Sequence, residues 1–327
     1  MFAPVSLPRT AWRENCDPLF AQDVADGLTR PRKTLPASWL YDEVGSALFE
    51  VITVLPEYGL TRADDGLLRR FAKDIVSAAG EPDLIVELGS GTGTKTRHVL
   101  EAAARRKGVE YLPIDISSAA LGSCESALRA LERVNVDPIE ASYLPGLERA
   151  FGRRRSGARA LVLFLGSTIG NFARSEATDL LRCIRGLAHT GDCLLLGTDL
   201  VKPGARLIEA YDDPLGVTAS FNLNMLARIN RELGGTFELS TFTHLARYNE
   251  RASRVEMHLR SRIAQEVDIE ALDLTVTFRR GETIWTESSH KFRADDVARM
   301  GERAGWTTAR RWVDDDWGFA ETLFACP

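Results

Sequence analysis

The sequence predicts an α/β fold built on a mostly parallel sheet, with a second part of α+β character inserted into it. Short apolar segments at residues 83–88, 111–116, 160–165 and 193–198 alternate with segments whose apolar residues have helical spacing. This alternation is typical of a parallel sheet that helices cover on both faces. Over residues 200–290 it gives way to period-two patterns, which indicate antiparallel strands.

Two helices are predicted ahead of the first strand. Residues 46–54 have helical spacing, and Pro56 ends that helix. Residues 63–78 carry apolar side chains three and four positions apart, which also indicates a helix. Between the parallel strands we expect further helices at residues 94–107, 118–133 and 175–187.

The later part of the chain predicts an insertion followed by the end of the main sheet. The insertion is expected to contain one helix and three antiparallel strands, at residues 218–233, 236–248, 254–264 and 273–278. A helix and a terminal antiparallel hairpin follow, at residues 295–304, 307–313 and 319–325. We therefore expect one domain formed by residues 63–199 plus 291–327, and a second formed by residues 12–62 plus 200–290.

The composition indicates a globular protein and excludes several classes. Hydrophobic residues make up 44% of the 327 residues and charged residues 27%, a balance that supports a buried core. The net charge is −5 without a basic block, so we expect no nucleic-acid partner. The five scattered cysteines predict reduced thiols in a cytoplasmic protein, without a metal site. We expect neither a signal peptide nor a membrane span, since no apolar run approaches roughly 20 residues.

A glycine-rich loop follows the first predicted strand, with the sequence Glu87-Leu88-Gly89-Ser90-Gly91-Thr92-Gly93. Glycine lets the backbone turn tightly and approach a ligand closely. In sheets of this kind ligands bind beyond the carboxyl ends of the strands. The loop therefore indicates a nucleotide-like cofactor, with a purely structural tight turn as the alternative.

The residues around this loop favour S-adenosylmethionine over a nicotinamide dinucleotide. Glu87 ends the strand, and the dinucleotide spacing G-x-G-x-x-G is absent because Thr94 follows Gly93. Asp115 ends the second strand, where a carboxylate can accept hydrogen bonds from ribose hydroxyls of either cofactor. Lys95 is a candidate ligand contact, with a solvated surface charge as the equal alternative.

Six longer stretches are more specific than the loop. They are LYDEVGSALFEVITVLPEYGLTR, ELGSGTGTKTR, LGSTIGNF, LLLGTDLVKPGARLIEAYDDPLGVTASFN, RVEMHLRS and WTESSHKF. With these stretches, from about Leu35 to the C-terminus, the chain resembles the histidine-specific, S-adenosylmethionine-dependent methyltransferases of the ergothioneine pathway. The resemblance implies a class I methyltransferase fold, with a Rossmann-like seven-stranded sheet and an inserted α+β substrate-binding domain.

The resemblance also implies roles for the residues that match. Asn171 and Tyr211 would bind the carboxylate end of the substrate, and Glu287 and Ser289 its imidazole. Tyr41 would lie near the α-amino group, Tyr58 on the pocket wall and Met257 beside the ring, which makes Tyr41 and Asn171 the catalytic candidates. The implied cofactor residues are Glu87, Gly89, Gly91, Lys95, Asp115, Ser142 and Tyr143. Without the resemblance, the tyrosines and Met257 would be assigned to the core and Glu287 and Ser289 to a solvated strand face.

Two positions depart from the family pattern. Where the family usually has P-E-Y-Y-P-T-R, this chain has Gly59 and Leu60 after Tyr58, which predicts a looser loop. Where the family places an Asp-Phe pair at the adenine, this chain has Ser142 and Tyr143. A serine accepts a hydrogen bond from the adenine amine more weakly than a carboxylate does.

The implied activity is Nα-methylation of L-histidine to the trimethylated betaine hercynine, by a monomeric enzyme that needs no metal. A carboxylate at position 287 suits an imidazole N–H. Methylation of another aromatic amino acid, such as tryptophan or a prenylated tryptophan, is the first alternative. A non-catalytic S-adenosylmethionine-binding protein and a nicotinamide dehydrogenase are the others.

Overall fold

The chain forms two compact units in the computed structural model, which describes residues 17–105 and 107–327. Unit 1 comprises the described residues up to Ile52 together with Gly204–Asn249 and Val255–Ser288. Unit 2 comprises Thr53–Pro203, Glu250–Arg254 and Ser289–Pro327. Residues 12–16 of the predicted second domain, and residue 106 of a predicted helix, lie outside the described residues. Residues 53–62, 200–203, 250–254 and 289–290, expected in the second domain, fall in unit 2.

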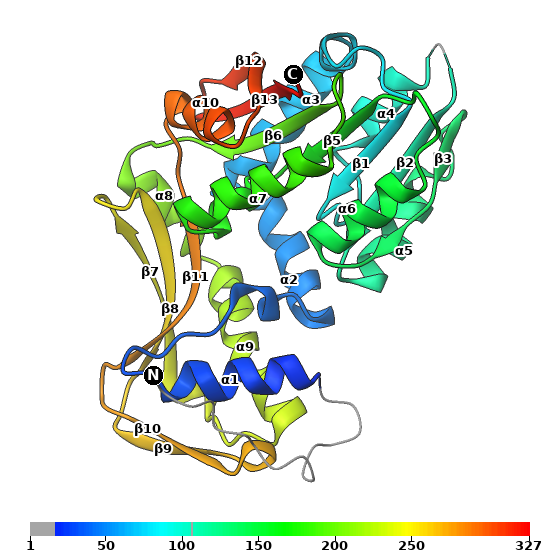
Figure 1. Cartoon of the computed structure of the whole chain (residues 1–327). Helices are drawn as coiled ribbons and strands as arrows, with labels where there is room; N and C mark the ends of the chain where they lie inside the picture. The colour runs from blue at the N-terminus through cyan, green and yellow to red at the C-terminus, as the bar shows by residue number, and fades with distance from the viewer. Residues whose placement is uncertain (1–16, 106) are drawn as a thin grey trace. The chain divides into compact units, whose positions relative to one another are not determined.

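A central sheet organises unit 2, with the strand order β12-β13-β6-β5-β1-β2-β3 (Figure 1). Its strands are β1 (Leu84–Leu88), β2 (Val109–Asp115), β3 (Val134–Val136), β4 (Ile139–Glu140), β5 (Ala160–Phe164), β6 (Cys193–Asp199), β12 (Thr307–Asp314) and β13 (Phe319–Ala325). β13 runs antiparallel to both β6 and β12, whereas the strands from β6 to β3 are parallel. The predicted seven-stranded sheet is confirmed. The position beyond β2 is shared by two short strands, β3 and β4, each of which pairs separately with β2.

Helices cover both faces of this sheet. They are α3 (Gly59–Ala78), α4 (Arg97–Ala103), α5 (Ser118–Leu128), α6 (Tyr143–Gly152), α7 (Arg174–Leu187) and α10 (Ala294–Arg303). α3 contacts α4 along one layer, and α7 contacts both α6 and α10 in the other. A cluster of buried apolar side chains joins the helices of the second layer to every second residue of β1, namely Leu84, Val86 and Leu88. The alternation of a strand therefore turns Glu87 toward the opposite face.

Unit 1 contains the antiparallel strands that the period-two patterns predict. β7 (Phe242–Asn249), β8 (Arg254–Ser261) and β11 (Thr283–His290) form one sheet in the order β11-β8-β7, and β9 (Gln265–Ile269) pairs with β10 (Leu274–Phe278) (Figure 1). Its helices are α1 (Pro18–Thr29), α2 (Glu43–Val54), whose end falls in unit 2, α8 (Gly204–Tyr211) and α9 (Val217–Leu233). Short 3-10 helices complete the order, at Ala37–Leu40, Leu239–Thr241 and Glu270–Leu272 here and at Thr168–Asn171 in unit 2.

Several predicted boundaries were wrong for local reasons. The helix expected at residues 94–107 is α4, which begins only at Arg97 because the preceding residues belong to the glycine loop. The strand expected from residue 236 begins at Phe242, after a 3-10 turn. The helices α1, α6 and α8 and the strands β3, β4, β9 and β11 were not predicted. No helix among the described residues has the length and apolarity that a membrane crossing requires.

Gly59 lies in the Pro56–Arg62 segment, whose sequence departs from the family pattern, and its lack of a side chain makes room for an aromatic ring. A Cβ atom at Gly59 would lie 2.2 Å from the indole of Trp317. The Arg62 guanidinium donates to the carbonyl oxygens of Leu55 (2.7 Å) and Pro56 (2.6 Å). The loop is therefore fastened by Arg62 and packed against Trp317.

We expect Gly59→Ala to lower the free energy of unfolding by about 1–3 kcal/mol, because the indole cannot move aside without strain. Gly66→Ala on the same helix is the matched control, since a Cβ there has no atom within 4 Å. The control should raise stability by about 0.5–1 kcal/mol through its helix preference. Chemical denaturation of both variants checks this, and equal effects would contradict the packing.

Candidate functional site

The glycine loop turns at the carboxyl end of β1 with three residues in the left-handed region. Gly89, Gly91 and Gly93 have φ angles of +71°, +52° and +67°. A Cβ atom at Gly93 would also meet Cys124 Sγ at 2.5 Å, so this position excludes larger residues twice over. The amides of Gly89 and Ser90 donate to the Ile114 carbonyl oxygen at 2.8 and 3.2 Å, which ties the loop to β2.

The Asp115 carboxylate holds the same loop from the end of β2. Its Oδ2 accepts from the Gly91 amide at 3.0 Å, and its Oδ1 accepts from the Ser117 amide at 3.0 Å. A carboxylate has about four acceptor positions, so two remain for a ligand. Asp115 therefore fits the predicted contact with two ribose hydroxyls.

Glu87 lies beneath the loop and is 2% exposed. Its carboxylate accepts from Thr96 Oγ1 at 2.7 and 2.8 Å and from the Tyr111 hydroxyl. Burial raises the pKa of Glu87 to about 7, although the hydrogen bonds from Tyr111 and Thr96 work in the opposite direction. These contacts indicate that Glu87 fastens the loop to β1 and β2.

Lys95 forms an ion pair and is no solvated surface charge. Its ammonium group donates to Asp64 Oδ2, and its side chain is 25% exposed. Burial acts to lower the pKa of Lys95, but the charge and the hydrogen bond of the Asp64 carboxylate raise it above its ordinary value. Asp64 Oδ2 also accepts from the Gly166 amide at 3.0 Å, which places Lys95 at the ends of β1 and β5.

The Ser142-Tyr143 pair stands at the start of α6. Ser142 is the N-cap residue, and the Tyr143 ring is 3.4 Å from the position that a Cβ at Gly89 would occupy. Tyr143 also packs edge-on against Phe164, with ring centroids 5.4 Å apart. An aromatic face therefore lies beside the glycine loop, where the family pattern has a phenylalanine.

Three of the predicted substrate residues belong to unit 2. Tyr58 is 7% exposed and precedes α3, and Asn171 ends the 3-10 helix that follows β5. Ser289 Oγ accepts a hydrogen bond from the fully buried Lys291 ammonium at 2.9 Å. Lys291 in turn pairs with Asp199 at 2.8 Å. This Lys291–Asp199 pair was not predicted from the sequence.

The other four predicted substrate residues belong to unit 1. Tyr41 packs edge-on against Phe49 and Phe221, at centroid distances of 5.4 and 5.5 Å. Tyr211 ends α8, Met257 lies on β8 and Glu287 on β11, and they are 6%, 2% and 9% exposed. Burial of Glu287 rules out the solvated strand face.

A hydrogen-bond network centred on the buried Asn222 joins the backbone around these residues. Asn222 Nδ2 contacts His244 Nδ1 at 2.9 Å, and Asn222 Oδ1 accepts from the Thr286 hydroxyl at 2.6 Å. His244 Nε2 reaches the Tyr211 carbonyl oxygen at 2.7 Å, and the Thr286 hydroxyl lies 3.1 Å from the Met257 carbonyl oxygen. Burial lowers the pKa of His244, so a neutral ring that donates to Tyr211 accepts from Asn222. The network fixes the segments that carry Tyr211, Met257 and Glu287.

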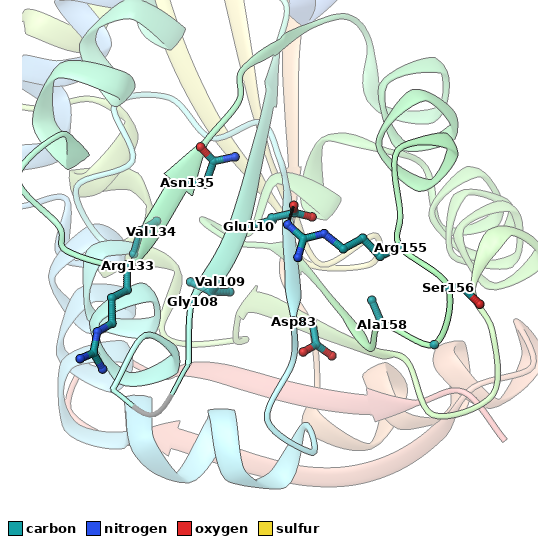
Figure 2. A pocket seen from close by; sticks show the side chains of 11 residues that line it. Asp83, Gly108, Val109, Glu110, Arg133, Val134, Asn135, Arg155, Ser156 and Ala158 are labelled. Atoms are coloured by element: carbon teal, nitrogen blue, oxygen red, sulfur yellow. Dashed lines mark hydrogen bonds and ion pairs between the residues drawn. The ribbon is translucent and has the colours of Figure 1, made fainter.

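A separate hollow of about 600 Å³ lies at the opposite edge of the unit 2 sheet (Figure 2). Residues at the amino ends of β1, β2 and β3, including Asp83, Val109 and Val134, line it. Its Glu110 and Arg155 side chains point toward each other and form an ion pair. The hollow is therefore distinct from the glycine loop at the carboxyl ends of these strands. Among the described residues, no group of His, Cys, Asp and Glu side chains could hold a metal ion.

We expect the buried Glu87 to make stability depend on pH. The unfolded chain releases this proton near the ordinary pKa of 4.5 and the folded chain near 7. The free energy of unfolding should therefore fall as pH rises across that window, by up to about 1.4 kcal/mol per pH unit. Glu87→Gln should make this slope shallower in denaturation curves between pH 5 and 8, while Glu321, whose pKa burial also raises, contributes equally to both proteins. His290, whose pKa burial lowers to about 4, contributes equally to both proteins.

The control for this prediction is Glu125→Gln, at an exposed position of α5. It should leave the slope unchanged. A Glu87→Gln profile parallel to that of the unmodified protein would show that Glu87 is ionised throughout the window.

Comparison with known proteins identifies the family. Residues 20–326 match the family described as histidine-specific methyltransferase, SAM-dependent. The chain is 43% identical to the histidine N-alpha-methyltransferases of Mycobacterium tuberculosis (93% of this chain, 94% of that protein) and Mycolicibacterium smegmatis (92% and 93%). It is 27% identical to an L-tryptophan methyltransferase of Psilocybe serbica, over 89% of this chain and 88% of that protein. The chain belongs to the histidine-specific, S-adenosylmethionine-dependent methyltransferase family.

Proposed function

We propose that this protein transfers methyl groups from S-adenosylmethionine to the α-amino nitrogen of L-histidine, and that the product is hercynine in ergothioneine biosynthesis. The observation that carries the proposal is the buried Glu287 carboxylate on β11, in a chain 43% identical to histidine N-alpha-methyltransferases. A carboxylate accepts hydrogen bonds, and the N–H of an imidazole ring is a donor of suitable chemistry.

The carboxyl edge of the unit 2 sheet offers groups that suit each part of the cofactor. Asp115 would accept from the ribose hydroxyls, Tyr143 would contact the adenine, and Lys95 would neutralise the carboxylate of the methionine part. Gly89 and Gly91 would let the backbone approach. When bound, S-adenosylmethionine supplies a methyl group on a cationic sulfur, so the protein needs mainly to position the two reactants.

The imidazole would be held by one hydrogen-bond acceptor and one hydrogen-bond donor. Glu287 would accept one ring N–H. Because Lys291 donates to Ser289 Oγ, the Ser289 hydroxyl hydrogen points elsewhere, and we propose that it is donated to the second, unprotonated ring nitrogen. This arrangement selects a neutral imidazole and disfavours an indole, whose single ring nitrogen is an N–H that cannot accept from the Ser289 hydroxyl.

The α-amino group must be neutral and directed at the methyl carbon. Asn171 and Tyr211 would hold the substrate carboxylate, and the Tyr41 hydroxyl would orient the amine or a water that removes its proton. Successive transfers give a cationic trimethylammonium group, which aromatic faces such as those of Tyr41 and Tyr58 attract.

The proposed substrate is a small molecule. We further propose a monomer that works in the cytoplasm, which the free thiols of Cys124, Cys183, Cys193 and Cys326 support.

Tryptophan is the second candidate substrate, because the 27% identical Psilocybe serbica relative is a tryptophan methyltransferase. The direct test is mass spectrometry of a reaction that contains S-adenosylmethionine and all the proteinogenic amino acids in competition. We expect histidine alone to gain up to three methyl groups. Methylated tryptophan would overturn the substrate assignment, and no methylated product at all would favour a non-catalytic binding protein.

Two substitutions should separate the imidazole contact from the carboxylate contact. Glu287→Ala should weaken histidine binding by about 1.5–3 kcal/mol, the scale of a hydrogen bond to a charged group, without improving the anchoring of other amino acids. Asn171→Ala should raise the Michaelis constant of histidine and of any poorer amino-acid substrate alike, because all share the carboxylate. Unchanged histidine affinity in Glu287→Ala, measured by calorimetry, would contradict the imidazole assignment.

A further inference from the structure

Two buried carboxyl groups of unit 2 face each other beneath Lys95. Asp64 on α3 and Glu321 on β13 are both fully buried, and their side chains lie within hydrogen-bonding distance of each other. Among the described residues, no donor reaches Asp64 Oδ1 or either Glu321 oxygen. Two ionised carboxylates have no hydrogen to share, so this contact requires one proton between them.

The surroundings determine which of the two carries the proton. Asp64 Oδ2 accepts from the Lys95 ammonium and the Gly166 amide, which stabilise a negative charge on Asp64. Glu321 has no such donors. Burial raises the pKa of Glu321 well above its ordinary value, and the negative charge of Asp64 adds to this effect. The proton therefore belongs to Glu321.

The groups that oppose Glu321 from neighbouring strands carry no charge. In register, Gly197 of β6 and Trp312 of β12 flank it. A Cβ atom at Gly197 would meet Glu321 Oε1 at 2.9 Å, so the glycine makes room for the carboxyl group. The charged groups near Glu321 are Asp64 of α3, Glu87 of β1 and Lys95 after the glycine loop.

We propose that Glu321 is a positioning residue of the cofactor site: it remains protonated, donates to Asp64 Oδ1, and leaves Asp64 as the single negative charge that holds the Lys95 ammonium beside Gly166. This inference rests on the proposed role of Lys95 toward the cofactor carboxylate. With Glu321 ionised, a second negative charge would draw Lys95 inward and repel that carboxylate. With Glu321 neutral, Lys95 stays available to the ligand.

The first test is infrared spectroscopy of the ligand-free protein at pH 8, where Glu87 is mostly ionised because its pKa is about 7. The unmodified protein should show the C=O stretching band of a protonated carboxyl group, and Glu321→Gln should lack it. The absence of such a band in the unmodified protein, or an unchanged band in Glu321→Gln, would overturn the proposal. The first of these outcomes needs no variant to fold.

The second test measures S-adenosylmethionine affinity by calorimetry, without histidine. Glu321→Gln keeps a donor to Asp64 and should bind as the unmodified protein does. Glu321→Leu leaves Asp64 Oδ1 without a donor and should bind about tenfold more weakly, the change that corresponds to about 1.4 kcal/mol. Thr322→Val, a buried position on the other face of β13, is the matched control and should not change the affinity.

A double-mutant cycle shows whether Glu321 acts through Lys95. In a Lys95→Met background, Glu321→Leu should cause no further loss of affinity. The same tenfold loss in both backgrounds, or equal affinities for Glu321→Gln and Glu321→Leu, would overturn the positioning role. None of these three tests uses histidine, so a failure of the substrate assignment would leave their results unaffected.

Discussion

Three carboxyl groups, those of Glu87, Asp64 and Glu321, are removed from water on one side of the unit 2 sheet, and each is at most 2% exposed. The cost of burying an ionised carboxylate is several kcal/mol unless donors surround it. Glu87 takes its donors from Thr96 and Tyr111, and Asp64 from Lys95 and Gly166. These donors lie in the segments that end at the carboxyl edge of the sheet. The need to provide donors for buried acids therefore fixes the loops at this edge, where we propose that the cofactor binds.

Unit 1 applies the same principle with neutral groups. The amide of Asn222 joins α9 to strands β7, β8 and β11 through His244, His258 and Thr286. A fully satisfied network of this kind admits one arrangement, because a shifted strand would leave buried polar groups without partners. The network thereby fixes the backbone at Tyr211, Met257 and Glu287, the residues that we propose contact the substrate.

The sequence predicted the parallel sheet well because apolar runs such as 160–165 have few alternatives to a buried strand. It missed the inserted strands β9 and β11, because polar residues outnumber apolar ones in both segments. The glycine loop named the candidate cofactor residues, whereas no motif indicated the side chains that hydrogen-bond to them. Asp64 did leave a signal: it shares the helical face of Leu67, Leu68 and Ile75, where an acid needs a buried partner. Glu321 likewise shares one buried face of β13 with Phe319 and Leu323, which lie two residues before and after it. Which partners these acids meet depends on tertiary packing, and a pattern within one segment does not contain it.

The Gly59-Leu60 departure shows how a change from the family pattern can be compensated. Loss of a tyrosine suggested a looser loop, but the space at Gly59 is taken by the Trp317 indole, which comes from a distant part of the chain. The Trp317 N–H in turn donates to Asp199 at 3.1 Å, the carboxylate that also pairs with Lys291. Gly59 at the start of α3 is thus linked by a chain of contacts to Lys291, which donates a hydrogen bond to Ser289.

The account is tested most directly by a crystal structure of the protein with S-adenosylhomocysteine and histidine. We expect the ribose hydroxyls on the Asp115 carboxylate, the cofactor carboxylate on Lys95, and an imidazole N–H on Glu287. Cofactor density away from Asp115 and Lys95, or an imidazole that does not touch Glu287, would contradict it.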